Sequence, residues 1–262
     1  MTRVLSALVL LPVVIGAVWF MPPIATLVVA CIAAVLAFIE YAGIIAALDV
    51  KIPRTVAGIA VVSACIAVGA SLVAVDLLLM SAVIVFGALA VAGGTPGART
   101  LHASVASVFP VAYIGLPLGA LAAVRAISGR EAVILLMVTI VISDSAQYYC
   151  GRAFGRRPLA PTISPKKTVE GAIGGLLFGT AAMVIGGRWI FPDADVILLG
   201  LVSAAIAALG IVGDLFESLL KRSAGVKDSS NIIPGHGGVL DRIDSWLFAA
   251  PVYYAFIKFL RF

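Results

Sequence analysis

Residues 218–244 read SLLKRSAGVKDSSNIIPGHGGVLDRID, and they lie between apolar runs near residues 195–216 and 244–261. The segment gathers aspartates, lysines, arginines, a histidine and glycines in a chain of which only 12% is charged and 62% is hydrophobic. A polar segment between two runs long enough to cross a bilayer predicts a loop at a membrane surface. We therefore expect the chemistry of this protein in that loop.

The rest of the chain is typical of an integral membrane protein. Its mean hydropathy is +1.17, and its apolar share exceeds the ~45–50% of soluble domains. Nine runs approach the roughly 20 residues that a spanning helix needs; they lie near 4–20, 24–47, 55–72, 76–93, 103–124, 131–150, 169–187, 195–216 and 244–261. The first run lacks a small-residue cleavage site, so we expect a retained span.

The expected fold class is all-α, a polytopic membrane helical bundle with about nine transmembrane helices. We expect one domain over residues 1–262, with N-terminal helices at 1–126 and a catalytic part at 127–262. Pro110 and Pro117 are expected to kink the fifth span. The three cysteines lie in apolar runs without the spacing of a disulfide or metal site, so we expect small buried side chains.

The basic residues predict the orientation. With the N-terminus inside, thirteen of the 18 lysines and arginines fall in internal loops and five fall outside. This bias places the loops 151–168 and 217–243 together on the cytoplasmic face. The net charge of +5 has the same explanation, or it indicates anionic partners such as lipid head groups or a phosphorylated substrate.

Acidic residues within the apolar runs are candidates for a metal site, because a carboxylate at the bilayer centre costs at least ~2.5 kcal/mol. Asp144 and Asp214 lie in the sixth and eighth spans, and Asp241 and Asp244 share one face at the start of the ninth. Converging carboxylates suit magnesium bound together with substrate phosphates. The alternative is a set of buried ion pairs with Lys221, Arg222 and Arg242. For Glu40 we expect a structural hydrogen bond to a neighbouring helix.

Two loops have the character of phosphate-binding segments. Lys166 and Lys167 precede a predicted helix that Thr168 would cap, and helix N-termini favour anions; the alternative is a basic loop that only sets orientation. In the later loop Gly237 and Gly238 would let the backbone approach a ligand closely. His236 beside them is expected to contact a phosphate or an acid, and no zinc-like spacing accompanies it.

These motifs resemble a known family. The run Ser218, Lys221–Arg222, Lys227–Asp228, Pro234, His236–Gly237–Gly238, Asp241–Arg242 and Asp244 resembles the signature of phosphatidate cytidylyltransferases, also called CDP-diacylglycerol synthases. The stretch ISPKKTVEG at 163–171 and the segment from Asp144 to Gly151–Arg152 also look like that family. The first ~100 residues match only in being hydrophobic.

The resemblance implies that CTP and phosphatidic acid react to CDP-diacylglycerol and pyrophosphate. It implies Mg²⁺, with a second cation such as K⁺, held by Asp144, Asp214 and Asp241. Implied catalytic residues are Asp214, Asp241, Lys227, His236 and Arg242. Implied substrate-binding residues are Ser164, Lys166, Lys167, Thr168, Ser218, Lys221, Arg222, Asp228, Gly237, Gly238 and Asp244. The implied setting is a bacterial inner (plasma) membrane with a cytoplasmic active site; membrane lipid is a partner, nucleic acid is not, and a homodimer is compatible with the sequence.

Two other functions are compatible with the pattern. A CTP-dependent lipid-alcohol kinase shares the membrane setting and the nucleotide but transfers the γ-phosphate. An ion-coupled transporter would use intramembrane acids to bind its ion, and it would have paired broken helices in two halves of the chain. We detect no such pairing in the sequence, and the polar residues gather on one face.

Overall fold

The structure is a computed structural model, and it describes residues 12–230, 232 and 237–260. The chain divides into two compact units. The first consists of Met1–Ala126 with Leu220–Arg242, and the second of Ile127–Leu219 with Ile243–Phe262. Most of the polar segment quoted above therefore belongs to the same unit as the N-terminal helices.

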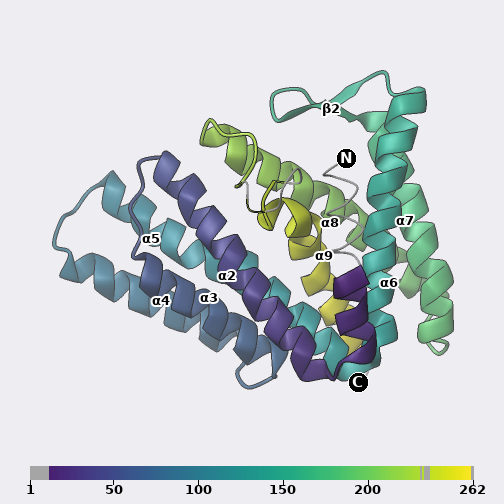
Figure 1. Ribbon diagram of the computed structural model, residues 1–262, viewed down its shortest axis with the longest axis horizontal. Coiled ribbons are helices and arrows are strands. Elements are labelled where there is room, and N and C mark those ends of the chain that lie inside the picture. Colours follow the sequence, from purple (N-terminus) through teal and green to yellow (C-terminus); the bar gives the residue numbers. More distant parts are fainter. Residues whose placement is uncertain (1–11, 231, 233–236, 261–262) are drawn as a thin grey trace. The chain divides into compact units, whose positions relative to one another are not determined.

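The first unit is built from antiparallel helices joined by short turns. They are α2 (Pro23–Ala47), α3 (Arg54–Gly69), α4 (Val75–Ala92), α5 (Ala98–Pro110), the π-helical turn η1 (Val111–Gly115) and the first part of α6 (Leu116–Phe154). Figure 1 shows α2, α3, α4 and α5 side by side. Close packing here depends on small residues: a Cβ at Gly115 or Gly119 would lie 2.6 or 2.7 Å from a carbonyl oxygen of α3.

The predicted disturbance at Pro110 takes the form of a π-helical turn. The helix widens over Val111–Gly115, between Pro110 and Pro117. Proline has no N–H to donate and its ring crowds the preceding turn, so the helix cannot continue with regular hydrogen bonding there. Tyr113 and Ile114 of this turn are buried, which places the irregular backbone inside the unit.

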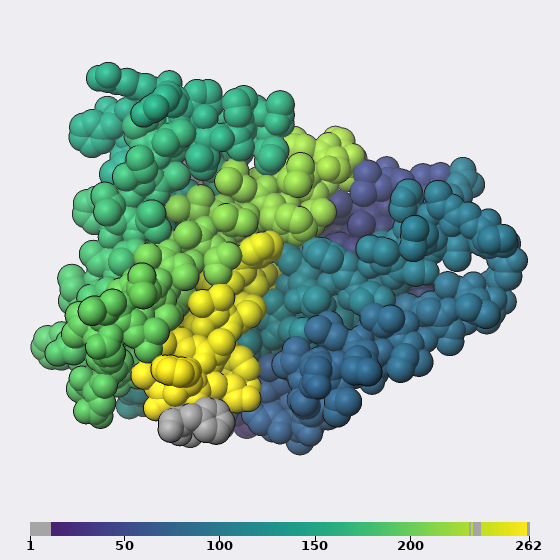
Figure 2. Space-filling model, turned by 180° about the vertical axis from the view of Figure 1, so that it is seen from behind, coloured from purple at the N-terminus to yellow at the C-terminus, as the bar shows by residue number. Residues whose placement is uncertain are grey.

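The second unit consists of four helical stretches and a hairpin. It takes α6 from residue 127, the antiparallel strands β1 (Pro158–Ala160) and β2 (Ser164–Thr168), α7 (Val169–Ile190), α8 (Val196–Ser223) up to residue 219, and α9 (Leu240–Phe259) from residue 243. In Figure 1, α6 and α7 run side by side and the hairpin lies at one end of the pair. Figure 2 shows α9, in yellow, against the green helix α8.

The helical membrane architecture agrees with the sequence, whereas the predicted count of about nine spans is not confirmed. Within the described residues, five helical stretches are long and apolar enough to cross a membrane: Pro23–Ala47, Val75–Ala92, Ala98–Phe154, Val169–Ile190 and Val196–Ser223. The fifth and sixth predicted spans form one stretch, which contains the π-helical turn and has a kink at Gly129, where φ is 85°. The helix Arg54–Gly69 is shorter, and most of the first predicted span lies outside the described residues.

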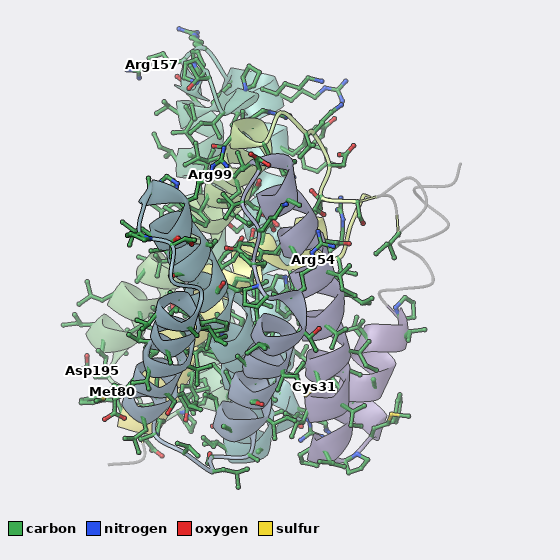
Figure 3. All side chains as sticks on the ribbon, turned by 90° about the vertical axis from the view of Figure 1, so that its left-hand side faces the viewer. Cys31, Arg54, Met80, Arg99, Arg157 and Asp195 are labelled. Carbon is green, nitrogen blue, oxygen red and sulfur yellow. The ribbon has the colours of Figure 1, made fainter. Side chains whose placement is uncertain are left out.

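In each unit, the labelled arginines lie toward one end of the helices. In the first unit, Figure 3 shows Arg54 and Arg99 toward one end of the helices and Met80 toward the other. In the second unit, Arg157, directly before β1, and Asp195, directly before α8, lie at opposite ends. This distribution is the one expected if the basic ends face the same compartment.

Candidate functional site

Asp241, in the first turn of α9, is the centre of a hydrogen-bonded cluster in the first unit. Its Oδ1 accepts from the Lys221 ammonium in an ion pair whose side chains are only 10% and 7% exposed. Its Oδ2 accepts from the Ser229 N–H at 3.1 Å, the Ser229 hydroxyl at 2.7 Å and the Gly238 N–H at 2.8 Å. The structure thus brings together three residues singled out in the sequence: Lys221, Gly238 and Asp241.

These donors decide the ionisation of Asp241. Burial by itself would raise the pKa of this carboxyl group. The hydrogen bonds from Lys221, Ser229 and Gly238 and the charge of Lys221 outweigh burial and hold the pKa at about 2. Asp241 is therefore ionised at any physiological pH.

Glu40 joins the same cluster from α2. Its carboxylate accepts from the hydroxyls of Ser229 and Ser230, at 3.0 and 2.6 Å, and from the N–H groups of Val239 and Leu240, at 2.9 and 2.7 Å. The sequence predicts a structural hydrogen bond to a neighbouring helix for Glu40. The structure gives it partners on the polar segment and at the first residue of α9.

The two described glycines of the polar segment fit against protein side chains. Gly237 has φ 80°, a left-handed conformation that favours glycine, and a Cβ there would lie 2.7 Å from Asp241 Oδ2. A Cβ at Gly238 would collide with the Ser229 hydroxyl and with both carboxylate oxygens of Glu40. The sequence assigned these glycines to close approach of a ligand, and the contacts provide a second reason for them within the fold.

The other predicted residues of the first unit lie around this cluster. Lys227, Asp228 and Arg242 are exposed, and the Arg222 guanidinium donates to the Val226 carbonyl at 3.0 Å. His236 lies outside the described residues, as does Pro234. Their roles remain predictions.

The second unit holds a separate charged cluster, formed by α6, α8, α9 and the end of the hairpin. Lys167, in β2, makes an ion pair with Asp214 of α8. Asp244 of α9 is buried and lies close enough to Asp214, Asp144 and Lys167 to interact with their charges. Asp144 of α6 accepts a hydrogen bond from Gln147 at 3.2 Å. Three predicted aspartates and one predicted lysine therefore meet within this unit.

Close helix contacts place these side chains. A Cβ at Gly213 would lie 2.5 Å from the Asp244 carbonyl oxygen, so α8 and α9 approach closely beside Asp214. On the other side, Gly171 and Gly175 of α7 pack against α6 around Gln147, three residues after Asp144. Small residues at such positions let helix backbones meet in a membrane.

The predicted cap of α7 is confirmed. The Thr168 hydroxyl accepts from the Gly171 N–H at 3.1 Å, which satisfies one of the free donors at the helix start. This cap fixes the end of β2 and therefore the backbone that carries Lys167. Ser164 and Ser218 are partly buried, and Lys166 is exposed.

The donor set is of the kind that magnesium prefers, although its geometry is not that of a complete site. Carboxylates of Asp144, Asp214 and Asp244 supply hard oxygen atoms. Among the described residues no group of three or more aspartate, glutamate, histidine or cysteine side chains converges closely enough to ligate a metal. Asp214 and Asp241 each pair with a lysine instead. Protein donors fill about four acceptor positions of Asp241, the usual capacity of a carboxylate, so a metal there would have to displace one of them.

The two clusters have chemistry in common. Each combines acidic side chains with a lysine, and each contains backbone N–H groups at the start of a helix, where anions are favoured. Such groups suit the binding of phosphates together with a cation. The profile of the cytidylyltransferase family matches residues 1–260. The chain belongs to the cytidylyltransferase family.

Individual members of the cytidylyltransferase family from bacteria are similar to part of this chain. A phosphatidate cytidylyltransferase of Haemophilus influenzae is 45% identical over 133 residues, 48% of this chain and 46% of that protein. One of Pseudomonas aeruginosa is 45% identical over 126 residues, again 48% and 46%. One of Helicobacter pylori is 40% identical over 155 residues, 59% and 58%. The chain thus matches about half the length of these relatives.

Sequence reasoning predicted a structural hydrogen bond for Glu40, but it missed Ser229 and Ser230 as partners in the first cluster. Glu40, Ser229 and Ser230 form its hydrogen-bonded centre, yet Glu40 stands alone in an apolar helix and the serines lie within a polar run. The available signal was the cost of burying Glu40, which is 3% exposed. A buried carboxylate requires donors, and the serine pair was a source of them.

Proposed function

We propose that this protein is a phosphatidate cytidylyltransferase, which converts CTP and phosphatidic acid to CDP-diacylglycerol and pyrophosphate. The observation that carries the proposal is the family match over residues 1–260 together with the signature residues at 218–244. The names of the similar bacterial proteins support the choice of phosphatidate as substrate. Family membership favours neither the kinase nor the transporter.

In the proposed reaction, a phosphate oxygen of phosphatidate attacks the α-phosphorus of CTP. A new P–O bond forms, the bond from the α-phosphorus to the bridging oxygen breaks, and pyrophosphate leaves with the electron pair. The attacking oxygen is already anionic, so no strong general base is required. The protein has to align two anions and offset their charge.

The residues divide these tasks in the following way. Lys166, Lys167 and Lys227 bind phosphates of CTP as point charges, as lysines do in other phosphate sites. Lys167 pairs with Asp214 in the structure, and it would exchange this carboxylate for a phosphate when CTP binds. His236 contacts pyrophosphate or an acid, and Arg222 and Arg242 contact phosphate or brace the acids. Ser164, Thr168, Ser218 and Asp228 complete the proposed substrate contacts.

Asp144, Asp214 and Asp241 are proposed to hold Mg²⁺, together with a second cation such as K⁺. When bound, magnesium supplies charge neutralisation at the reacting phosphates. Asp241 is not assigned a role as a proton donor, because its pKa of about 2 keeps it ionised at neutral pH.

The setting follows from the lipid substrate. Its acyl tails stay in the bilayer while its head group meets CTP at the membrane surface. We propose that the site faces the cytoplasm of a bacterial inner membrane, because thirteen basic residues fall in the internal loops and five in the external ones. The proposal is compatible with a homodimer and does not require one.

The test uses purified full-length protein with phosphatidic acid, Mg²⁺ and CTP labelled at the α-phosphate. The proposal predicts label in the extracted lipid and one pyrophosphate released for each labelled lipid. Label that remains in CDP, with a lipid alcohol phosphorylated instead, would establish the kinase. Absence of both products from folded protein overturns the proposal.

A further inference from the structure

Glu40 gathers donors from two stretches of the polar segment. Ser229 and Ser230 donate from one stretch, and Val239 and Leu240 donate from the other, 189 to 200 residues away in sequence. The side chain is almost completely buried, at 3% exposed. Hydrogen bonds to a charged group in such a place contribute more than neutral ones. One carboxylate therefore fixes both described sides of the segment.

The position of Glu40 within α2 is itself firmly set. The next residue, Tyr41, is 1% exposed, and its hydroxyl donates to the Ala106 carbonyl at 2.9 Å. The Tyr41 ring also packs near Phe109, with 6.1 Å between centroids. These contacts with α5 hold α2 in place. The hydrogen bonds of Glu40 therefore fix the polar segment relative to α2.

The carboxylate also lies at the start of α9. Leu240 is the first residue of that helix, and its N–H group has no partner within the helix. Glu40 accepts from this N–H and from that of Val239, where negative charge is favoured by the helix dipole. Asp241 is the next residue, so the cap fixes the backbone that carries it.

Ser229 connects the two carboxylates. Its hydroxyl lies 3.0 Å from Glu40 Oε2 and 2.7 Å from Asp241 Oδ2. A hydroxyl has one proton and donates to one acceptor at a time, so the two acids share a single donor. This contact between Ser229 and Glu40 requires glycine at position 238, since a Cβ there would collide with both side chains.

We propose that Glu40 is a positioning residue for the reaction: it holds Ser229–Ser230 and Gly238–Leu240 so that Asp241 keeps its orientation. It acts through these residues and does not touch the substrate. This inference rests on the proposed function for its catalytic part, whereas the local ordering of the segment is independent of it.

The test compares Glu40→Gln with Tyr41→Phe. Glu40→Gln keeps the size of the side chain but places an amide NH₂ among groups that donate. Tyr41→Phe removes one buried hydrogen bond from the same helix and keeps the ring that packs near Phe109, so α2 should stay in place. We expect kcat of Glu40→Gln to fall about 10- to 100-fold, with KM for CTP and phosphatidate within about threefold. Tyr41→Phe should stay within about twofold in all three.

Hydrogen–deuterium exchange provides the readout that does not depend on turnover. In Glu40→Gln, amide exchange should accelerate in the peptides that contain Ser229–Ser230 and Gly238–Asp241, while α3 and α4 keep their protection. Equal acceleration throughout the protein would indicate a general loss of stability and overturn the proposal. An unchanged kcat in the folded variant would also overturn it.

Two further outcomes have a defined meaning. If Glu40→Gln does not fold, Ser230→Ala removes one donor to the same carboxylate, and unchanged kcat and exchange in that variant reject the positioning role. If the wild type does not use CTP and phosphatidate, the proposed function fails by itself. The exchange experiment then decides alone whether Glu40 orders the segment.

Discussion

Asp241 combines burial with full ionisation, because Lys221, Ser229 and Gly238 all donate to its carboxylate. We expect Asp241→Asn to lower cytidylyl transfer by about 10²- to 10³-fold or more, because in the proposed site it removes charge from the reacting centre. It also breaks the buried ion pair with Lys221, and breaking such a pair costs about 3–5 kcal/mol. The measurements are lipid labelling from CTP and thermal unfolding in detergent.

The double variant Asp241→Asn with Lys221→Met is the control for that loss of stability. It also removes the buried charge of Lys221, so stability should return toward the wild type while activity stays lost. Recovery of turnover in the double variant, or normal turnover in Asp241→Asn, would contradict the role assigned to Asp241.

The pH dependence of stability follows from the same contacts. The pKa of Asp241 is lowered from 3.8 to about 2 in the folded protein. A lowered pKa stabilises the fold above pH ~4, by about 2 kcal/mol here, and this contribution disappears as the pH falls through ~2. The stability difference between the wild type and the double variant Asp241→Asn with Lys221→Met should therefore be constant from about pH 5 to 9, because the double variant has no buried lysine at position 221 that could titrate in this range. A difference that changes by more than about 1 kcal/mol in this range would show that Asp241 titrates there.

Gly238→Ala tests the crowding at the same cluster with one methyl group. The added Cβ would displace Ser229 and Glu40, and overpacking of this kind costs about 1–3 kcal/mol. We expect reduced thermal stability and a reduced kcat. Gly200→Ala in α8 is the matched control, because nothing lies within 4 Å of a Cβ there. Equal effects of the two substitutions would show that the glycine requirement at 238 is not steric.

At the level of elements, the hairpin and α7 are joined by the cap at Thr168. Thr168→Ala removes the acceptor for the Gly171 N–H and should cost about 1 kcal/mol. For a protein of this size the unfolding midpoint should fall by about 2–4 °C. Thr168→Ser keeps the hydroxyl and should stay close to the wild type in the same thermal measurement. Equal unfolding midpoints for Thr168→Ala and Thr168→Ser would show that the cap does not contribute to stability.

The elements also show what hydropathy can and cannot predict. The sixth run was placed at 131–150, yet α6 continues to Phe154, because backbone hydrogen bonding persists after the side chains turn polar. The hairpin was not predicted. Its two strands are held by pairing across the turn, with Pro158 opposite Thr168, and a hydropathy profile along the chain does not detect such pairing. The cap at Thr168 was predicted, because a capping residue acts on the N–H three positions later.

Across the whole chain, the acids of α6, α8 and α9 were found in the sequence because charge within an apolar run is visible in one dimension. Their meeting in the second unit follows from close helix contacts such as that of Gly213 with Asp244. Glu40 could not be assigned in this way. Its partners lie 189 to 200 residues away, and neither periodicity nor spacing connects them.

Orientation is the property of the whole molecule on which a cytoplasmic site depends, and each unit provides a pair of positions to test it. In the first unit, Arg99 begins the α5 region and Leu72 lies between α3 and α4 with 67% exposure. In the second, Arg157 and Asp195 lie at opposite ends (Figure 3). Single cysteines at these positions, in a background without Cys31, Cys65 and Cys150, can be labelled by a membrane-impermeant maleimide.

In intact spheroplasts we expect labelling of Leu72→Cys and Asp195→Cys, and no labelling of Arg99→Cys and Arg157→Cys until the membrane is opened. The reason is that basic loops are retained on the cytoplasmic side. A reversed pattern in both pairs would place the charged clusters on the side without CTP and would contradict the proposed reaction. A reversed pattern in one pair alone would mean that the number of crossings between Leu72 and Asp195 differs from the prediction, because an odd change in that number inverts everything after it.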